Sequence, residues 1–223
     1  MSLPPLVFAA GVAIVVPSII GLIMFRGLPS DLKPLSFLFV IHAVITIVQF
    51  FLAYKRINNI WTSHIYNIIE VALLLGIFSL WTDSRKARLI FWSIMGLYVI
   101  LWIVAKVIFE QFDLAPVYTP MISRIILLTA TIYIILFIGA TTTERVLAGE
   151  PKFWFAAGFL LAYAGSLMFY GFKSLINDLP YDEIVKIWSI HWVVTILSNS
   201  FFIAGFVCVP LVRNTGGQLE LAQ

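Results

Sequence analysis

The sequence predicts an all-α, polytopic membrane protein that folds as a bundle of seven transmembrane helices. Three observations lead to this prediction. Of the 223 residues, 61% are hydrophobic and only 11% are charged, whereas about 25% of a typical soluble domain is charged. The mean hydropathy of the chain is +1.02. The apolar residues are also grouped in seven runs, each close to the length of about 20 residues with which a helix crosses a bilayer core. The lipid bilayer is therefore the expected surrounding of this chain.

The seven runs give the predicted spans, within a few residues at each end. They are Leu6–Phe25, Leu35–Tyr54, Trp61–Trp81, Leu89–Phe109, Met121–Thr141, Phe153–Phe172 and Ile187–Val209. The first run is too long for the core of a signal peptide and follows no basic segment, so we expect it to remain as a helix. Because the connections are short, we expect one transmembrane domain over residues 1–212. The remaining residues, 213–223, contain Gly216 and Gly217 and are expected to be a disordered tail.

Lysine and arginine residues predict the orientation, because cytoplasmic loops carry an excess of them. One end of the bundle collects Arg26, Lys33, Arg85, Lys86, Arg88, Arg145, Lys152 and Arg213, and the other collects Lys55, Arg56, Lys106, Arg124, Lys173 and Lys186. The larger group favours a cytoplasmic C-terminus and an N-terminus outside, although the Lys55-Arg56 pair opposes this assignment. Aromatic residues at the predicted helix ends are expected to lie at the bilayer surface. They are Trp61, Trp81, Trp154, Trp188, Tyr54 and Tyr118.

Charge and cysteine content exclude several classes of function. The formal net charge is only +3 and the basic residues are dispersed among short loops, so we predict no nucleic-acid binding. The single cysteine, Cys208, excludes a disulfide within the chain and a cysteine-based metal cluster.

A short pattern, I-W-[ST]-x-H, opens both the third and the seventh span. The two copies run from Ile60 to His64 and from Ile187 to His191, and each follows a span that begins just after a proline. One interpretation is a 3+1+3 architecture, in which two three-helix units repeat in the same orientation around a linking helix. Parallel repeats of this kind occur among transporters, whose ligands bind near the repeat interface. The other interpretation is coincidence, because tryptophan is common at helix ends.

Polar side chains within the spans gather toward the predicted outer surface. Ionisable residues inside a membrane are costly and by default face the bundle interior or a wet cavity. Glu70, about 13 Å below the outer end of its span, is the deepest carboxylate. We predict a cavity open to the outside, walled by the third, fifth, sixth and seventh spans, with Glu70 near its floor. Its candidate ligand-binding residues are His64, Asn67, Glu70, Lys106, Arg124, His191, Thr195, Ser198 and Asn199.

The chemistry of these residues narrows their roles. Glu70 needs a partner such as Arg124, Lys106 or a histidine, because an unpaired carboxylate at that depth would be protonated. The hydroxyl groups have a simpler explanation, which is hydrogen bonding between helices. The three histidines lie at two depths and position 195 is threonine, so no H-x-x-x-H pair occurs on the last span. We therefore predict no metal site, no catalytic residue and no resident cofactor.

The stretch Asn58-Asn59-Ile60-Trp61 with His64, Tyr66 and Glu70, together with Ile187, Trp188 and His191, resembles a set of small seven-helix proteins of unassigned function common in Bacteroidota-type bacteria. That resemblance covers the whole chain and implies a bacterial inner membrane, but it supplies no activity. A 3+1+3 arrangement of this length is also similar to the superfamily of small sugar transporters and KDEL receptors, although their proline-glutamine signatures are not evident here.

Three functional hypotheses follow. The leading one is a small-molecule binding protein, either a transporter or a receptor-like sensor, that uses the outward cavity and is not an enzyme. A sensor would need a partner membrane or signalling protein, because no soluble output domain is predicted. The alternatives are a membrane-embedded lipid hydrolase that uses histidines and an accessory subunit of a membrane complex.

Overall fold

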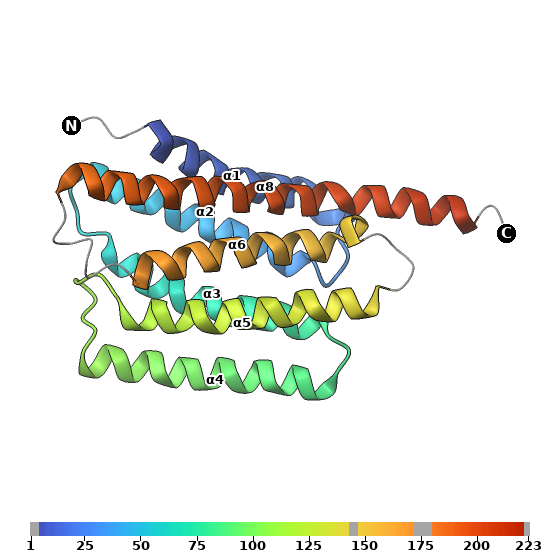
Figure 1. Cartoon of the computed structure of the whole chain (residues 1–223), viewed down its shortest axis with the longest axis horizontal. Coiled ribbons are helices and arrows are strands. Elements are labelled where there is room, and N and C mark those ends of the chain that lie inside the picture. The colour runs from blue at the N-terminus through green and yellow to red at the C-terminus, as the bar shows by residue number, and fades with distance from the viewer. Residues whose placement is uncertain (1–4, 143–146, 172–179, 221–223) are drawn as a thin grey trace.

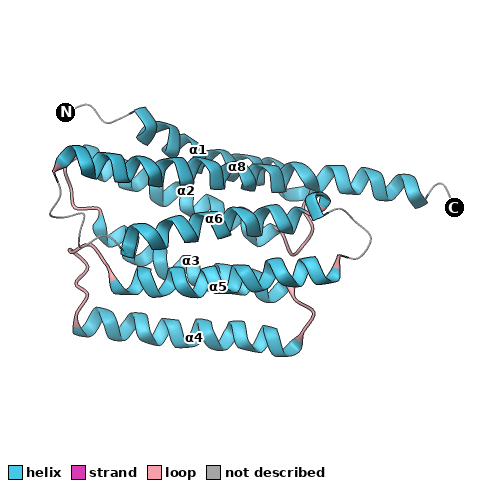
Figure 2. Ribbon diagram, viewed as in Figure 1, coloured by secondary structure: helices cyan, strands magenta, loops and turns pink. Residues whose placement is uncertain are grey.

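The computed structural model describes residues 5–142, 147–171 and 180–220, with residues 171, 181–182 and 211–220 described by their backbone only. Within these ranges every regular element is helical (Figure 2). The α-helices are α1 (Pro5–Met24), α2 (Lys33–Tyr54), α3 (Ile60–Trp81), α4 (Arg85–Ile108), α5 (Tyr118–Thr141), α6 (Pro151–Gly171) and α8 (Tyr181–Glu220). Two short 3-10 turns, Phe25–Gly27 and Leu147–Gly149, complete the set. All 7 α-helices are long and apolar enough to cross a membrane.

The predicted helices are confirmed, with differences at their polar ends. Helix α4 begins at Arg85, before the predicted start, because Ser84 caps it by accepting a hydrogen bond from the N–H of Ala87. Arg85, Lys86 and Arg88 in that first turn lower the local hydropathy, so the predicted span began later, at Leu89. Helix α8 continues to Glu220, so its backbone includes most of the segment 213–223 for which we expected disorder.

Six of the helices form a closed ring, and the seventh lies outside it. Around the ring α1 packs on α2, α2 on α3, α3 on α5, α5 on α6, α6 on α8, and α8 returns to α1. Helix α4 packs on the outside of α3 (Figure 1). The three helices α1 to α3 and the three helices α5, α6 and α8 thus follow one another around the ring in chain order. A 3+1+3 repeat would have this arrangement, with α4 as its linking helix, and the repeat itself stays a prediction.

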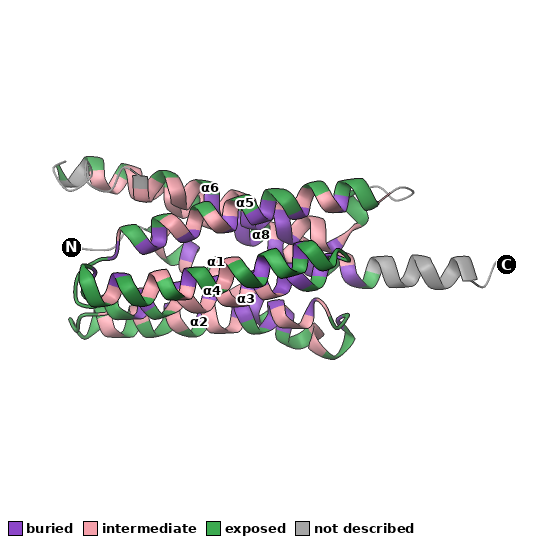
Figure 3. Ribbon diagram, turned by 90° about the horizontal axis from the view of Figure 1, so that it is seen from below, coloured by how far each residue is buried: buried purple, intermediate pink, exposed green. Residues whose placement is uncertain are grey.

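The outer faces of the ring are apolar. Ile23 on α1 and Leu136 on α5 are among the most exposed large hydrophobic side chains of the described residues, as is Val107 on α4 outside the ring, and Figure 3 shows exposed positions along the outward sides of the helices. The prediction that Trp81 lies at the surface is wrong. Trp81 is buried, and its indole N–H donates a hydrogen bond of 3.1 Å to the backbone oxygen of Asp31. A tryptophan at a helix end can face inward when a loop carbonyl accepts its N–H.

Candidate functional site

Two adjoining chambers lie inside the ring. The deeper chamber has a volume of about 230 Å³ and the shallower one about 220 Å³. The shallower chamber lies toward the end of the bundle that holds the α2–α3 and α4–α5 connections, which we call the α2–α3 end. Five residues line both chambers and join them: His42, Tyr66, Arg124, Tyr170 and His191. Together the chambers form a single cavity with walls from α1, α2, α3, α5, α6 and α8.

An ion pair lies where the chambers meet. A guanidinium nitrogen of Arg124, on α5, lies 2.6 Å from a carboxylate oxygen of Glu70, on α3. The second carboxylate oxygen of Glu70 accepts a hydrogen bond of 3.1 Å from the hydroxyl of Tyr163, on α6. The guanidinium of Arg124 also stacks on the ring of Tyr163, with its central carbon Cζ 5.2 Å from the ring centroid. The predicted need for a partner to Glu70 is confirmed, and the partner is Arg124.

Polar side chains from α8 face the ion pair across the deeper chamber. His191, Thr195, Ser198 and Asn199 all line it. The hydroxyls of Thr195 and Ser198 donate to carbonyls one turn earlier in α8, at 2.9 and 2.7 Å. Such internal bonds satisfy hydroxyls in apolar surroundings. Within the described part of the chain, three buried side-chain nitrogens have no hydrogen-bond partner, and two of them belong to residues of this cavity: Nδ1 of His191 and Nε of Arg124. Both residues line both chambers, so the cavity wall holds unused hydrogen-bonding capacity.

The shallower chamber is more polar than the deeper one. The side chains that line only this chamber include Thr46, Gln49, Ser63 and Asn67. The amide nitrogen of Gln49, on α2, donates to the hydroxyls of Thr62 and Ser63, on α3, at 2.9 and 3.1 Å. His42 stacks on Tyr66 with ring centroids 4.9 Å apart. Helix α2 therefore contributes to the polar wall, although the sequence prediction had left it out.

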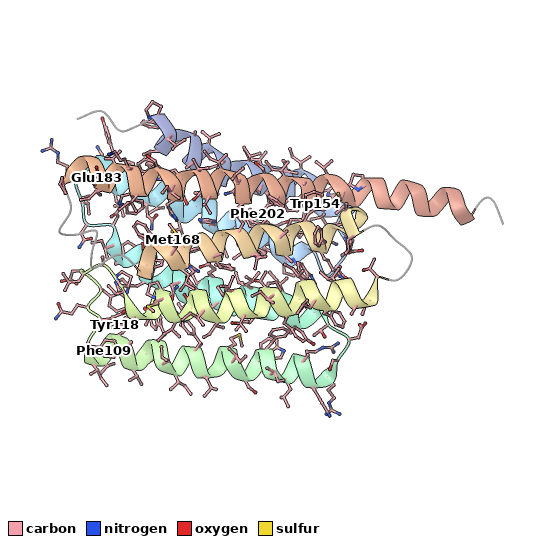
Figure 4. The ribbon with its side chains drawn as sticks, viewed as in Figure 1. Phe109, Tyr118, Trp154, Met168, Glu183 and Phe202 are labelled. Atoms are coloured by element: carbon pink, nitrogen blue, oxygen red, sulfur yellow. The ribbon has the colours of Figure 1, made fainter. Side chains whose placement is uncertain are left out.

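An aromatic layer forms the floor of the cavity, on the side away from the α2–α3 end. The rings of Phe39, Phe159 and Phe202 line the deeper chamber and contact one another at centroid distances of 4.7 to 6.2 Å. Phe202, labelled in Figure 4, lies between α8 and α6. Below them Phe155 and Phe206 are fully buried and in contact at 4.9 Å. Glu70 lines this deeper chamber together with the first three of these rings and does not line the shallower one.

Close helix packing holds this layer together. A Cβ atom on Gly158 would lie 2.5 Å from the ring of Phe202, and one on Gly205 would lie 2.9 Å from the ring of Phe155. These two glycines let the rings of the facing helix lie directly against the backbone. At the same end of the bundle, the Lys152 ammonium on α6 lies 2.6 Å from the carboxylate of Asp31, between α1 and α2.

His64 and Lys106 line neither chamber, which corrects their predicted place in the cavity. They belong instead to a buried network beside α4. The Lys106 ammonium lies 2.5 Å from Nδ1 of His64, 2.6 Å from the carboxylate of Glu110 and 3.3 Å from the hydroxyl of Thr119. Nε2 of His64 lies 2.9 Å from the carbonyl oxygen of Leu114. Because that carbonyl can only accept, the ring proton is on Nε2, and Nδ1 accepts from Lys106.

Glu110 caps the first turn of α5. One carboxylate oxygen accepts the backbone N–H groups of Val117, Tyr118 and Thr119 at 3.2, 2.7 and 3.0 Å. Burial alone would raise the pKa of Glu110, but hydrogen bonds from Lys106 and Thr119 outweigh it and lower the pKa to about 2. The carboxylate therefore stays ionised next to the positive end of the α5 dipole. Every donor of the ammonium has an acceptor here, so the network joins α3, α4 and α5 and has a structural role.

Asn67 lines the shallower chamber, but its amide nitrogen and its amide oxygen both form hydrogen bonds with other side chains. Its amide nitrogen donates to the hydroxyl of Ser123 at 2.7 Å, and its amide oxygen accepts from the hydroxyl of Tyr98. All three side chains are buried. Asn67 thus links α3 to α4 and α5 and closes one side of the chamber.

Sequence reasoning missed the aromatic lining. Tyr66, Phe159, Phe169 and Trp188 all line the deeper chamber, yet aromatic residues are so frequent in this chain that composition does not single them out. Helix α6 carries aromatic residues at four-residue spacing: Phe155, Phe159 and Tyr163. This spacing is the one sequence signal that could have placed these three rings on one inward face.

No group of three or more histidine, cysteine, aspartate or glutamate side chains within the described ranges is placed to hold a metal ion. Comparisons with protein-family models, with curated proteins and with solved structures found no match to this chain.

Proposed function

We propose that this chain is a multi-pass membrane protein that binds a small molecule in the cavity between its two three-helix units. The observation that carries the proposal is the Glu70–Arg124 ion pair on the wall of a polar and aromatic cavity. Two opposite charges deep in an apolar bundle are costly to desolvate and are typical of functional sites in membrane proteins.

The exposed surface and the loop charges support a membrane location. The outward faces of 7 apolar helices would match the hydrocarbon core. Lys106 and Arg124 are each held in a buried ion pair, so they are not loop charges. The α2–α3 end then keeps only Lys55, Arg56, Lys173 and Lys186 from its original group. This favours an N-terminus outside and a cytoplasmic C-terminus, in a bacterial inner membrane as the resemblance implies.

The cavity suits a small amphipathic ligand. Its volume is modest, and many of the residues that line its deeper part are aromatic, so their rings would contact an apolar or planar body. Arg124 and His191 would supply hydrogen bonds through their unused nitrogens after a small side-chain adjustment. The ion pair leaves no net charge on the wall, so the ligand is expected to be neutral or weakly charged. The aromatic floor separates the ligand site from the opposite end of the bundle.

A ligand screen tests this proposal. Purified protein would be screened by thermal shift against small amphipathic aromatic compounds. Hits should lose their effect in Ala162→Trp, which fills the deeper chamber, and keep it in Ile100→Ala, an exposed position on α4. The variant Ser166→Ala, which lines the same chamber with a small change, should retain partial binding. If every hit stabilises Ala162→Trp as much as wild type, the cavity is not the binding site.

Transport and sensing are separated by a second experiment. A confirmed ligand would be offered to proteoliposomes that contain the protein. Uptake that is lost in Ala162→Trp identifies a transporter, whereas binding without uptake identifies a sensor that signals through a partner membrane protein.

The hydrolase alternative now rests on a different pair of histidines. His42 and His191 both line the two chambers, while His64 does not. A lipid-cleaving activity that is lost in both His42→Ala and His191→Ala would favour this alternative over ligand binding.

A further inference from the structure

The position of α4 outside the ring leaves a second, separate cavity. Helix α4 packs mainly on α3 and only sparsely on α5. A groove with a volume of about 580 Å³ lies between α4 and α5, the two neighbouring helices at the lower edge of Figure 1. It shares no lining residue with the two chambers of the central cavity.

The lining of this groove has two chemically different parts. Its walls come from both helices and are mainly apolar, with Thr129 as a polar exception among Ala87, Ile90, Phe91, Ile94, Ile125, Ile126, Ala130 and Tyr133. Phe91 closes the groove from behind, because its ring contacts Phe78 of α3 and Tyr133 of α5 at 6.2 and 5.8 Å. At one end lie Ser84, in the α3–α4 connection, and Lys86, in the first turn of α4.

The charged end has an unpaired cation. Lys86 is exposed and forms no ion pair with any residue that the structure describes. Arg85 follows the capping residue on the same turn, and Asp83 lies in the same connection but does not line the groove. The first turn of a helix of 24 residues adds the positive end of its dipole. This end of the groove therefore attracts an anion.

The length of the groove matches one leaflet. From Lys86 to Ile94 the wall of α4 rises about 12 Å at 1.5 Å per residue, and half of a hydrocarbon core about 30 Å thick is about 15 Å. We propose that this groove is a binding site for an acidic phospholipid, with one acyl chain between α4 and α5 and the phosphate at Lys86. The proposal rests on the membrane location, and it places the site in the proposed cytoplasmic leaflet, where anionic lipids attract basic segments.

Native mass spectrometry of the delipidated protein tests the assignment. The protein would be titrated with dioleoylphosphatidylglycerol and with dioleoylphosphatidylcholine, which have the same chains and differ in headgroup charge. We expect tighter binding of phosphatidylglycerol. Lys86→Gln should weaken it about fivefold, the effect of one basic residue at a membrane surface, and should leave phosphatidylcholine unchanged. Arg85→Gln, on the same turn but not in the lining, should have a smaller effect.

A second pair of variants tests the groove itself. Ile90→Trp fills it from an exposed position, so the fold should survive, and it should abolish binding of both lipids at this site. Ile100→Trp, which is exposed on the same helix outside the groove, is the matched control and should bind as wild type does. Equal affinity for the two lipids, or equal losses in Lys86→Gln and Arg85→Gln, would overturn the proposal. A lipid-free dimer that dissociates in Ile90→Trp would instead assign the groove to a second copy of the chain. None of these outcomes depends on the central cavity, whose test uses Ala162→Trp.

Discussion

Glu70 and Arg124, which are 54 positions apart in the sequence, form a 2.6 Å ion pair that connects the two three-helix units of the ring. Glu70 belongs to α3 and Arg124 to α5, and α3–α5 is one of the two pairs of neighbouring helices in the ring that join the units. The other is α8–α1, where a Cβ atom on Gly21 would lie 2.9 Å from the ring of Phe206. One interface between the units is thus joined by charge beside the cavity, and the other by close apolar packing.

Removing one member of this pair should destabilise the protein strongly. Glu70→Gln or Arg124→Gln should each cost about 3 to 5 kcal/mol, because the remaining charge is buried without its partner. The double variant should cost less than the sum of the two, since neither charge remains. Unfolding in detergent, followed by circular dichroism, measures all three. Single variants as stable as wild type would show that the pair is not buried in this way.

The contribution of Glu110 to stability should depend on pH. Its pKa in the folded protein is about 2, below the ordinary value of 4.5. A lowered carboxyl pKa stabilises the folded state above about pH 4.5, and this stabilisation is lost as the pH falls toward 2. Glu110→Gln should therefore melt below wild type at pH 7, and the two melting temperatures should converge between pH 4.5 and 2. Glu183→Gln, at an exposed ion pair on α8, is the control and should follow wild type throughout. A gap that stays constant down to pH 2 would contradict the capping role.

The aromatic floor should tolerate no added atom at Gly158. A Cβ atom there would meet the ring of Phe202 at 2.5 Å and the backbone oxygen of Ser198 at 3.0 Å. Gly158→Ala should cost about 1 to 3 kcal/mol through overpacking. Gly76→Ala, on α3, meets nothing within 4 Å and should be neutral or stabilising by up to about 1 kcal/mol, because alanine favours the helix. Thermal unfolding compares the two, and equal effects would argue against a tightly packed floor.

The proposed orientation can be measured by labelling from one side. In a Cys208→Ser background, Lys55→Cys should react with a membrane-impermeant maleimide in intact cells, and Arg85→Cys should react only after the membrane is permeabilised. Both positions are exposed at opposite ends of the bundle. The reverse pattern would invert the topology, and the cavity would then lie toward the cytoplasm.

Some features of the candidate site could be predicted because they follow from local sequence and the cost of charge in apolar surroundings. Glu70 on one helix required a partner on another, and Arg124 was among the candidates. Four polar residues of the last span were among the predicted cavity residues, and they do share the chamber wall: His191, Thr195, Ser198 and Asn199. Sequence spacing carries no information on which helices become neighbours. The contributions of α2 and of the aromatic floor were therefore not foreseen.

The two histidines of the I-W-[ST]-x-H pattern have different surroundings, which the pattern itself does not predict. His64 and His191 open their helices with the same I-W-[ST]-x-H pattern. His64 is held by Lys106, because α4 packs on the outside of α3. Among the described elements no outer helix packs on α8 in the same way. Nδ1 of His191 therefore has no hydrogen-bond partner among the described residues.

The sequence by itself determined the seven apolar helices and the requirement that their few charges be paired, since both follow from the free energy of placing each side chain in apolar surroundings. Only the tertiary structure decided which charges meet, and it did so through the order of helices around the ring. That order places Arg124 opposite Glu70 and leaves α4 outside, which draws His64, Lys106 and Glu110 into a closed network away from the cavity.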